Sequence, residues 1–465
     1  MLRVLEFVLF LLFAFFRSFI TTFIIMIYKL FGKFISARAK LEWEEWMGGD
    51  LKAEHGDNPK IAFEVSSEGE LEQALPLMRY FKSCHFEIEL LYASFSAKIK
   101  AIKEGKILGA KTLVMPILTY SIWPSLCGFN ILKIIKAKTL VLCRYDFYPE
   151  LLFWKIFSAK KSLVLISASL KNKKIGKGFF LPSLFWHWLY DHFDLIICAS
   201  PLEKERFISL GLSRDKLHLF DFRIQQIFNR QKNADPYLLT KLPGEYVANL
   251  KALTPDQKII LGNAYKEDLQ ILKDKKIQEL ISLGKLHILI APHSLNKENI
   301  RAMWQELEQI VNPLKLVLLD SKKNRSFDLL GGVFFCEIPG ILCELYTLFS
   351  CAYVAGGFHR SVHSILEPYL AGNVVITGPK IHRSTEFDLA QNNSPHFVLS
   401  VEELSDVAQV ILEKLNLLKI KETREIYKKE IELWSQNFRD ENLQIICQKI
   451  LKGEEDKLKN ARKRI

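Results

Sequence analysis

The sequence lacks the closely spaced cysteines of a zinc site or a redox motif. Its eight cysteines include no C-x-x-C pair, and most lie in apolar runs such as LVLCRY and LIICAS. They are Cys84, Cys127, Cys143, Cys198, Cys336, Cys343, Cys351 and Cys447. Cysteines in such surroundings are typical of small buried thiols in a reducing compartment, so we expect neither a disulfide framework nor a structural zinc site.

A nucleic-acid motif is also missing. Lysines and arginines are spread along the chain and form no compact basic cluster interleaved with aromatic residues, which argues against a nucleic-acid partner. There is no internal repeat and no low-complexity tract. The chain nevertheless has 64 Lys and Arg against 52 Asp and Glu, a formal net charge of +12. This surplus favours an anionic partner, and a membrane surface or an acidic substrate fits better than nucleic acid.

Residues 1–33 are strongly apolar. Uncharged runs extend from Phe7 to Phe16 and from Ser18 to Tyr28, and only Arg17 separates them. Together they approach the roughly 20 residues that span a bilayer. Arg17 at the bilayer centre would cost about 2.5–3.5 kcal/mol. A spanning helix and a helix that lies in the membrane interface therefore both fit this segment.

A cleaved signal peptide is a third interpretation of the N-terminus, because Ala37-Arg38-Ala39 loosely matches a small-residue cleavage site. The flanking basic residues Lys29, Lys33 and Lys40 instead favour a cytoplasmic location for the chain that follows. We therefore predict a cytoplasmic body that is held at the membrane by its N-terminus.

Short apolar runs rich in β-forming residues alternate with helical patterns from Lys60 onward. The first block of such runs extends from IAFEV to HLFDF, and the second from KIILGNA to NVVITGP. This alternation is typical of parallel strands joined by crossover helices. A polar stretch with Pro236, Pro243 and Pro255 separates the blocks and indicates a linker with one short helix. We predict two doubly wound, Rossmann-like α/β domains.

The predicted organisation has five parts. They are a membrane anchor (1–33), an N-terminal domain (34–228), a linker (229–256), a C-terminal domain (257–400) and C-terminal helices (401–465). Ligands of open α/β sheets bind beyond the carboxyl ends of the strands, so two such domains place the expected site in a cleft between them. The basic tail KLKNARKRI fits either a solvated helix end or a contact with anionic lipid.

The stretch VSSEGELEQALPLMRYF places Glu70 where a predicted strand gives way to a predicted helix. Glu70 falls in the first helical turn, at the carboxyl end of the first strand. A carboxylate there would face the cleft and can accept a proton from a hydroxyl nucleophile. The structural alternative is that Ser67 is the N-cap and Glu70 completes a capping box.

The stretch from Gly331 to Phe358 contains a candidate anion site. A strand is predicted to end near Glu337, and a Pro-Gly turn follows it. The next helix would present its first backbone N–H groups, those of Gly340, Ile341 and Leu342, to an anion. Proline at a helix start is also ordinary architecture.

The stretch HRSVHSILEPYLAGNVVITGP follows the turn Gly356-Gly357. His363 and Glu367 stand four residues apart, so we expect both on one face of a helix. Glu367 would then bind a ribose hydroxyl, and His363 or Ser364 a phosphate or carboxylate. A zinc pair is disfavoured because no third ligand lies nearby in the sequence. A single histidine on a helix is also commonly structural.

The order and spacing of these motifs resemble those of the 3-deoxy-D-manno-octulosonic acid (Kdo) transferase family. The shared pattern is S-x-G-E before an amphipathic helix, L-C-E-L-Y after a Pro-Gly turn, A-G-G, H-x-x-L-E and a late T-G-P. It extends from the apolar N-terminus to about Phe397. Members are membrane-associated glycosyltransferases of the GT-B fold that act on lipid A precursors. The resemblance implies that fold, with two Rossmann-like domains facing a cleft and an N-terminal membrane-anchoring helix.

The resemblance also implies roles for residues of the N-terminal half. The glutamate of S-x-G-E, which matches Ser67, Gly69 and Glu70, would be the general base. The family's strand-end E-T-E-L-W-P looks like RYDFYP here. Asp146 therefore stands where the second acid is expected, although an aspartate reaches less far than a glutamate.

The donor-side motifs depart further from the family pattern. The family's phosphate-binding G-E-L-M-x-L-Y resembles GILCELY, which begins at Gly340. Its H-N-P-L-E resembles HSILE, which keeps His363 and Glu367 and has Ser364 and Ile365 in place of the Asn and Pro. These matches imply that the nucleotide of the donor binds here.

Four further residues are assigned to the donor side by position. Arg223 stands where a basic residue follows the last strand of the N-terminal domain. Asn263 and Tyr265 stand where a serine and a histidine normally follow the first strand of the C-terminal domain. His293 is the best match to the histidine of the family's P-R-H-P-E-R-F.

The implied reaction is the transfer of Kdo from CMP-Kdo to a lipid A precursor (lipid IVA), with inversion, in lipopolysaccharide core biosynthesis. Glu70 would deprotonate the acceptor hydroxyl, and the helix at Gly340 and Arg223 would stabilise the departing CMP phosphate. No metal or other cofactor is expected, in keeping with the absence of a D-x-D motif from the cleft segments. The expected partners are CMP-Kdo, the lipid acceptor and membrane lipids, at the cytoplasmic face of the bacterial inner membrane.

Two alternatives remain open on the sequence. A GT-B glycosyltransferase with another nucleotide-sugar donor would keep Glu367 but need not keep S-x-G-E. A degenerate, non-catalytic membrane-bound family member would account for the altered motifs around Arg144 and His293. It would not account for the joint retention of Glu70, His363 and Glu367.

Overall fold

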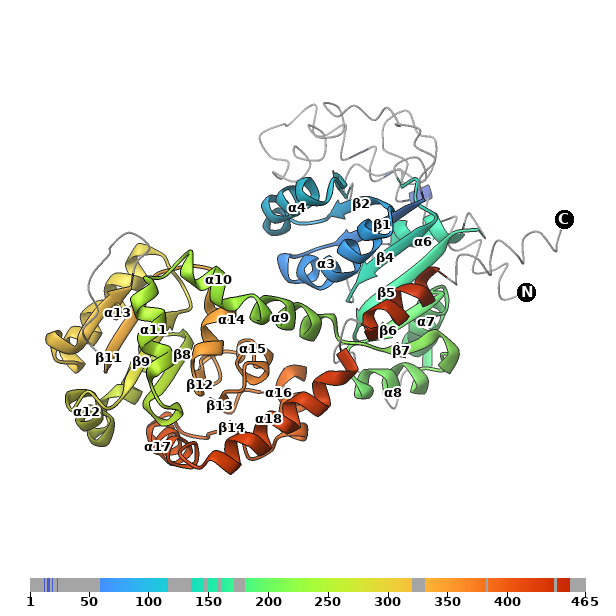
Figure 1. The fold of residues 1–465 in the computed structure, drawn as a ribbon. Helices are drawn as coiled ribbons and strands as arrows, with labels where there is room; N and C mark the ends of the chain where they lie inside the picture. The colour runs from blue at the N-terminus through green and yellow to red at the C-terminus, as the bar shows by residue number, and fades with distance from the viewer. Residues whose placement is uncertain are drawn as a thin grey trace. The chain divides into compact units, whose positions relative to one another are not determined.

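The computed structural model describes two α/β units. The described residues are 59–115, 135–144, 149–156, 160–170, 180–319, 331–381, 384–438 and 441–451, with five helical residues between 12 and 23. Unit 1 comprises Met1–Arg223 and Phe438–Ile465, and unit 2 comprises Ile224–Asn437. Each unit is built on one seven-stranded sheet (Figure 1). The prediction of two doubly wound α/β sheets is thereby confirmed.

The sheet of unit 1 has the strand order β3-β2-β1-β4-β5-β6-β7, and its neighbouring strands are parallel. The strands are β1 (Lys60–Val65), β2 (Glu87–Tyr92), β3 (Lys111–Val114), β4 (Thr139–Cys143), β5 (Ser162–Ala168), β6 (Leu195–Cys198) and β7 (Leu217–Leu219). The chain winds outward from β1 in one direction and then from β4 in the other. The topological switch point, where ligands of such sheets bind, therefore lies between β1 and β4.

The helices of unit 1 include α3 (Glu68–Ser83), α4 (Phe95–Leu108), α6 (Pro149–Ile156), α7 (Phe180–Asp191) and α8 (Pro201–Ser209). Helices α3, α4 and α8 each begin at a serine N-cap. The hydroxyl of Ser94 accepts from the N–H of Ala97 at the start of α4, and Gly109 ends that helix with φ of 61°. Such a left-handed C-terminal residue is most easily a glycine.

The sheet of unit 2 has the order β10-β11-β9-β8-β12-β13-β14, again with parallel neighbours. The strands are β8 (Lys258–Ala264), β9 (His287–Pro292), β10 (Leu316–Leu319), β11 (Gly332–Cys336), β12 (Cys351–Val354), β13 (Val374–Thr377) and β14 (Val398–Ser400). The order reverses between β8 and β12, which is the switch point of this sheet. Strand β14 is the one strand here without a counterpart among the predicted runs.

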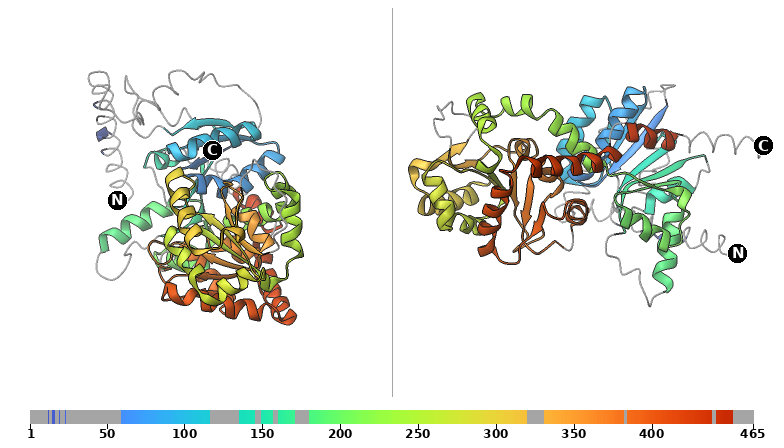
Figure 2. Two further views of the ribbon diagram at one scale, coloured as in Figure 1. Left: turned by 90° about the vertical axis from the view of Figure 1, so that its left-hand side faces the viewer. Right: turned by 60° about the horizontal axis from the view of Figure 1, so that its bottom comes forward.

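The helices of unit 2 flank this sheet, as the two further views in Figure 2 show. They are α10 (Ala234–Leu239), α11 (Gly244–Ala252), α12 (Lys275–Ser282), α13 (Lys297–Ile310), α14 (Leu342–Leu345), α15 (Leu366–Leu370), α16 (Thr385–Asn393), α17 (Val407–Leu417) and α18 (Lys421–Ser435). Helix α9 (Phe222–Lys232) spans the point where the chain enters this unit.

The segment that we expected to be a linker, 229–256, contains the end of α9 and two further helices, α10 and α11. Leu238, Tyr246 and Leu250 of these helices are at most 1% exposed and belong to the core of unit 2. Its prolines start or punctuate short helices, which explains why the segment shows no clear helical period in the sequence. The C-terminal helices also divide between the units, because the chain returns to unit 1 at Phe438.

The cysteines behave as predicted where the structure describes them. Of the seven described cysteines none forms a disulfide, and all except Cys84 are buried. Most of the predicted membrane anchor lies outside the described residues. In the part of the chain that the structure describes, no helix combines the length and the apolar character needed to cross a membrane.

Candidate active site

Glu70 lies in the first turn of α3, just after the carboxyl end of β1. Strand β1 is one of the two strands that border the switch point of unit 1. Ser67 is the N-cap of α3, and its hydroxyl accepts from the Glu70 N–H at 3.3 Å. The Glu70 carboxylate accepts from the N–H of Ser66 at 2.6 Å. The predicted capping arrangement is therefore present, except that the carboxylate returns to Ser66 and not to Ser67. Glu70 is only 3% exposed, so the chain holds this carboxylate in one orientation.

Gly69 precedes Glu70 in the same helical turn. A Cβ at position 69 would meet no atom within 4 Å, so packing within the described chain does not require a glycine there. On the opposite side of the switch point, Arg144 follows β4 with φ of 65°, and its N–H donates to the carbonyl of Ile166. Asp146, the predicted second acid, lies outside the described residues.

Arg223 is paired within unit 1. Its Nε and Nη2 donate to the two carboxylate oxygens of Asp221 at 3.0 and 2.6 Å. Asp221 is fully buried, and a bidentate pair with a buried carboxylate fixes the guanidinium and compensates its charge. The role predicted for Arg223 as an added positive charge at a donor phosphate is weakened by this pairing.

Three side chains of unit 2 converge at the carboxyl ends of the neighbouring strands β9, β8 and β12. Tyr265 follows β8, His293 follows β9, and His363 lies in the loop after β12. The Tyr265 hydroxyl lies 3.0 Å from Nε2 of His363. The ring centroids of His293 and His363 are 4.5 Å apart and those of Tyr265 and His293 are 4.8 Å apart. We call these three residues the ring cluster.

The surroundings favour the neutral form of the two histidines of the ring cluster. Burial, together with the neighbouring His293 and Arg360, lowers the pKa of His363 from 6.5 to about 4. Burial and Arg360 also lower the pKa of His293. The guanidinium carbon of Arg360 lies 5.2 Å from the Tyr265 ring centroid. The site therefore combines uncharged rings with one arginine, which suits a flat ligand that carries negative charge.

The backbone around the ring cluster is shaped by a bulge and by two glycines. Asn263 has φ of 55°, where the pairing register of β8 shifts between Gly262 and Ala264. A Cβ on Gly356, whose φ is 98°, would lie 2.6 Å from the carbonyl oxygen of Ser361. A Cβ on Gly357 would lie 2.6 Å from the backbone nitrogen of Gly378. Both predicted turn glycines are thus required by close backbone contacts.

The prediction that His363 and Glu367 share a helix face is wrong. Helix α15 begins at Leu366, and His363 belongs to the preceding loop. The loop is held back against β12, since the His363 N–H donates to the carbonyl of Ala355. The Ser364 hydroxyl instead donates to the carboxylate of Glu386 at 3.1 Å. Of this motif, only His363 joins the ring cluster.

The predicted anion site at Gly340 is shorter than expected. Helix α14 has four residues and continues only as a 3-10 turn, so its dipole is much weaker than that of a long helix. Arg230 contacts this turn: Nε and Nη2 donate to Glu344 at 2.7 Å each, and Nη2 donates to the carbonyl of Gly340 at 3.2 Å. Nη1 of Arg230 lies 4.0 Å from Glu367.

The sequence interpretation missed Arg230, Arg360 and Glu386. Arg230 stands in the segment expected to be a linker, and its partners are more than 100 residues away, at Glu344 and Gly340. Glu386 accepts from the N–H groups of Ile365 and Leu366 across about 20 residues. Of these three residues, only Arg360 could have been singled out from the sequence, because it directly follows His359 in the motif HRSVH. Among the described residues, no group of three or more His, Cys, Asp or Glu could hold a metal ion.

Comparison with known proteins finds similarity to Kdo transferases. Residues 41–221 match a family model described as 3-deoxy-D-manno-octulosonic-acid transferase (kdotransferase). The chain is 24% identical to a 3-deoxy-D-manno-octulosonic acid transferase of Chlamydia trachomatis over 440 residues, which cover 91% of this chain and 94% of that protein. It is 25% identical to one of Rickettsia prowazekii over 62% of this chain and 59% of that protein. The chain is therefore similar to Kdo transferases over most of its length.

Solved structures show a similar fold. A glycosyltransferase from Rickettsia africae is similar with a TM-score of 0.53 at 14% identity, over 87% of this chain and 100% of that chain. UGT73P12 of Glycyrrhiza uralensis is similar with a TM-score of 0.53 at 9% identity, over 88% of this chain and 99% of that chain. The two-sheet architecture is accordingly that of GT-B glycosyltransferases.

Proposed function

We propose that this protein transfers Kdo from CMP-Kdo to a hydroxyl of a lipid A precursor in lipopolysaccharide biosynthesis. The observation that carries the proposal is the match to a Kdo transferase over 91% of the chain, because it includes both sheets and both groups of candidate residues. The protein is a glycosyltransferase, and its reaction is proposed to proceed with inversion at the anomeric carbon.

Glu70 is proposed to act as the general base. Its carboxylate takes the proton of the acceptor hydroxyl while the hydroxyl oxygen attacks the anomeric carbon of Kdo. The bond from that carbon to the CMP phosphate breaks, and CMP leaves with the electron pair. One observation supports this role, because the Ser66 N–H donates to the carboxylate and orients it. Asp146 is retained as the proposed second acid.

The ring cluster and Arg360 are proposed to bind the donor nucleotide. A flat pyrimidine fits against stacked rings, and Arg360 supplies the positive charge that the phosphate needs. This assignment moves the phosphate contact away from the short helix α14, whose dipole is weak, and from Arg223, whose charge Asp221 compensates. Glu367 and Asn263 are retained as proposed donor contacts. No metal or other cofactor is included.

The protein is proposed to work at the cytoplasmic face of the inner membrane. Besides the apolar N-terminal segment, helix α4 supports this location. Its exposed face carries Phe95, Ile99 and Ile107, which are 49%, 80% and 68% exposed, together with the exposed lysines Lys103 and Lys106. Apolar side chains flanked by lysines are the composition that binds anionic lipid surfaces, where a lipid acceptor resides.

The first experiment measures Kdo transfer from CMP-Kdo to lipid IVA by the membrane-bound protein. The Glu70→Gln variant keeps an oxygen that accepts from Ser66, so it is expected to fold. Its rate should fall by at least about a hundredfold, which is the scale for losing a general base. Glu68→Gln is the matched control, since Glu68 is exposed in the same helical turn; its rate should stay within about twofold.

Three results would count against parts of this proposal. Equal rates for wild type and Glu70→Gln would remove Glu70 as the base. Donor binding without transfer to lipid IVA would indicate a different acceptor. A folded wild-type protein that does not bind CMP-Kdo would contradict the donor assignment and favour a non-catalytic family member.

A further inference from the structure

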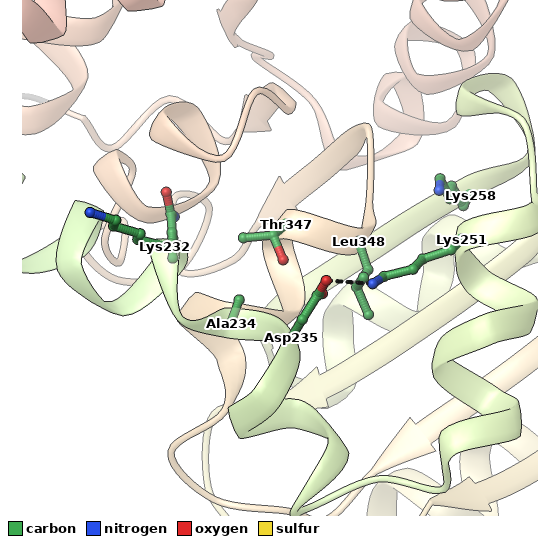
Figure 3. Close-up of a pocket in the computed structure, with 8 residues that line it drawn as sticks. Lys232, Ala234, Asp235, Lys251, Lys258, Thr347 and Leu348 are labelled. Carbon is green, nitrogen blue, oxygen red and sulfur yellow. Dashed lines mark hydrogen bonds and ion pairs between the residues drawn. The ribbon is translucent and has the colours of Figure 1, made fainter.

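A cavity of about 400 Å³ lies in unit 2 beside Lys258, the first residue of β8. Its size is within the range of small-molecule sites in proteins. It is lined by Gln231, Lys232, Ala234, Asp235, Lys251, Lys258, Thr347 and Leu348. In Figure 3, Lys232 lies on one side, Lys251 and Lys258 lie on the other, and Thr347 and Leu348 stand between them.

This cavity is separate from the ring cluster. Lys258 is the first residue of β8, whereas Tyr265 directly follows the last one. A strand of this length, seven residues, extends over roughly 20 Å. The cavity therefore lies at the amino-terminal edge of the sheet, and the ring cluster lies at its carboxyl edge.

The charge of the cavity lining is positive. The lining contains three lysines and one carboxylate. The carboxylate is that of Asp235, which pairs with Lys251 at 2.5 Å. Both partners of that pair are about half exposed, 48% and 55%, so water screens it. Within the described part of the chain, no carboxylate forms an ion pair with Lys232 or Lys258. The lining thus holds two lysines whose charge the protein does not compensate locally.

Lys258 is the residue that points most directly to a ligand. It is only 9% exposed, and its Nζ donates to the carbonyl of Leu250 at 2.9 Å. That carbonyl belongs to the last turn of α11, a favourable but neutral partner. Burial lowers the pKa of Lys258, as expected for an ammonium that has lost water without gaining an anion. An ammonium has three donors, and one carbonyl occupies only one of them.

We propose that this cavity binds a small anion that carries a phosphate group. Lys258 and Lys232 would supply the charge. The carboxamide of Gln231 donates to the carbonyl of Glu367, and its second N–H is a further donor for a phosphate oxygen. Phosphate oxygens are the acceptors that lysine clusters of this kind hold in proteins. The inference does not depend on the proposed reaction, because it rests on the cavity alone.

Isothermal titration calorimetry of the full chain with inorganic phosphate and with CMP tests the site. The titration extends to ~10 mM, so that binding weaker than a Kd of about 1 mM is still detected. Lys258→Met keeps the length of the side chain and removes its charge. We expect it to weaken phosphate binding at least about tenfold, which is the effect of losing one charge-assisted contact. Lys241→Met is the matched control, a lysine of the same unit outside the cavity, and it should leave binding unchanged.

Two further arms locate the site and its natural ligand. Arg360→Met removes the charge beside the ring cluster and should leave the Lys258-dependent binding in place. In a second titration, vesicles that contain phosphatidylglycerol replace free phosphate. If the protein binds these vesicles through Lys258 but does not bind free phosphate, the phosphate group belongs to a lipid headgroup. Phosphate binding that Lys258→Met and Lys232→Met do not change, or no binding of phosphate or vesicles by wild type, would overturn the proposal. A melting temperature for each variant shows that it is folded.

Discussion

The pKa of His363 makes a quantitative prediction about stability. In the unfolded chain this imidazole takes up a proton near pH 6.5, whereas in the folded protein burial, His293 and Arg360 delay protonation to about pH 4. Between these values the unfolded state binds more protons, so the free energy of unfolding must rise with pH. The stabilisation is fully present above about pH 6.5 and is lost as the pH falls through this window towards about 4.

The size of the effect follows from the shift. A difference of about 2.5 pKa units would correspond to at most about 3.4 kcal/mol. His363 is only partly buried, so solvent screening reduces this figure to about 1–2 kcal/mol. This amount is large compared with the stability of a domain, which is about 5–15 kcal/mol.

The assay is urea unfolding of wild type and His363→Gln between pH 7.5 and 4.5. Glutamine offers an oxygen to the Tyr265 hydroxyl but does not titrate, so the difference between the two proteins isolates His363. We expect that difference to shrink by about 1–2 kcal/mol as the pH falls. Arg360→Met removes one cause of the low pKa and should make the change smaller. A difference that is constant with pH, or an NMR titration of His363 with a midpoint near 6.5, would refute the reasoning.

Two further predictions concern contacts that the structure makes explicit. Gly357→Ala should lower the free energy of unfolding by about 1–3 kcal/mol, since its Cβ would overlap the backbone of Gly378. Gly69→Ala should raise the free energy of unfolding by about 0.5–1 kcal/mol, because the position is helical and has open space for a Cβ. If both variants lost the same free energy of unfolding, the packing argument would be contradicted. A double-mutant cycle of Arg230→Met and Glu344→Gln should give a coupling of about 2 kcal/mol in thermal unfolding, and a coupling near zero would contradict the bidentate pair.

Several parts of the fold are visible in the sequence because they depend on local patterns. Strands that are buried on both faces read as continuous apolar runs, and thirteen of the fourteen strands coincide with such runs. Strand β14, with three residues, is the one that was not predicted. The start of α3 was predictable as well, since the N-cap Ser67 and Glu70 are three residues apart.

Local spacing fails where long-range contacts set the backbone. His363 and Glu367 have the spacing of helical neighbours, yet His363 lies in the loop before the helix. Its N–H donates to the carbonyl of Ala355, and its ring contacts the hydroxyl of Tyr265. In the same way, Arg230 appears as an ordinary polar residue in the sequence. Its role depends on Glu344, which only the folding of α9 against α14 brings within 2.7 Å.

The sequence alone was sufficient for the fold class, the resemblance to Kdo transferases and the position of Glu70, because apolar periodicity and short motifs are properties of neighbouring residues. The tertiary structure was needed for the ring cluster and the lysine-lined cavity. Tyr265 and His363 are 98 residues apart, and they meet because β8 and β12 are neighbours in the sheet. Lys258, which no carboxylate of the described residues pairs with, is likewise buried because it is the first residue of β8. Strand order and burial are set by the packing of the whole unit, and no local pattern encodes them.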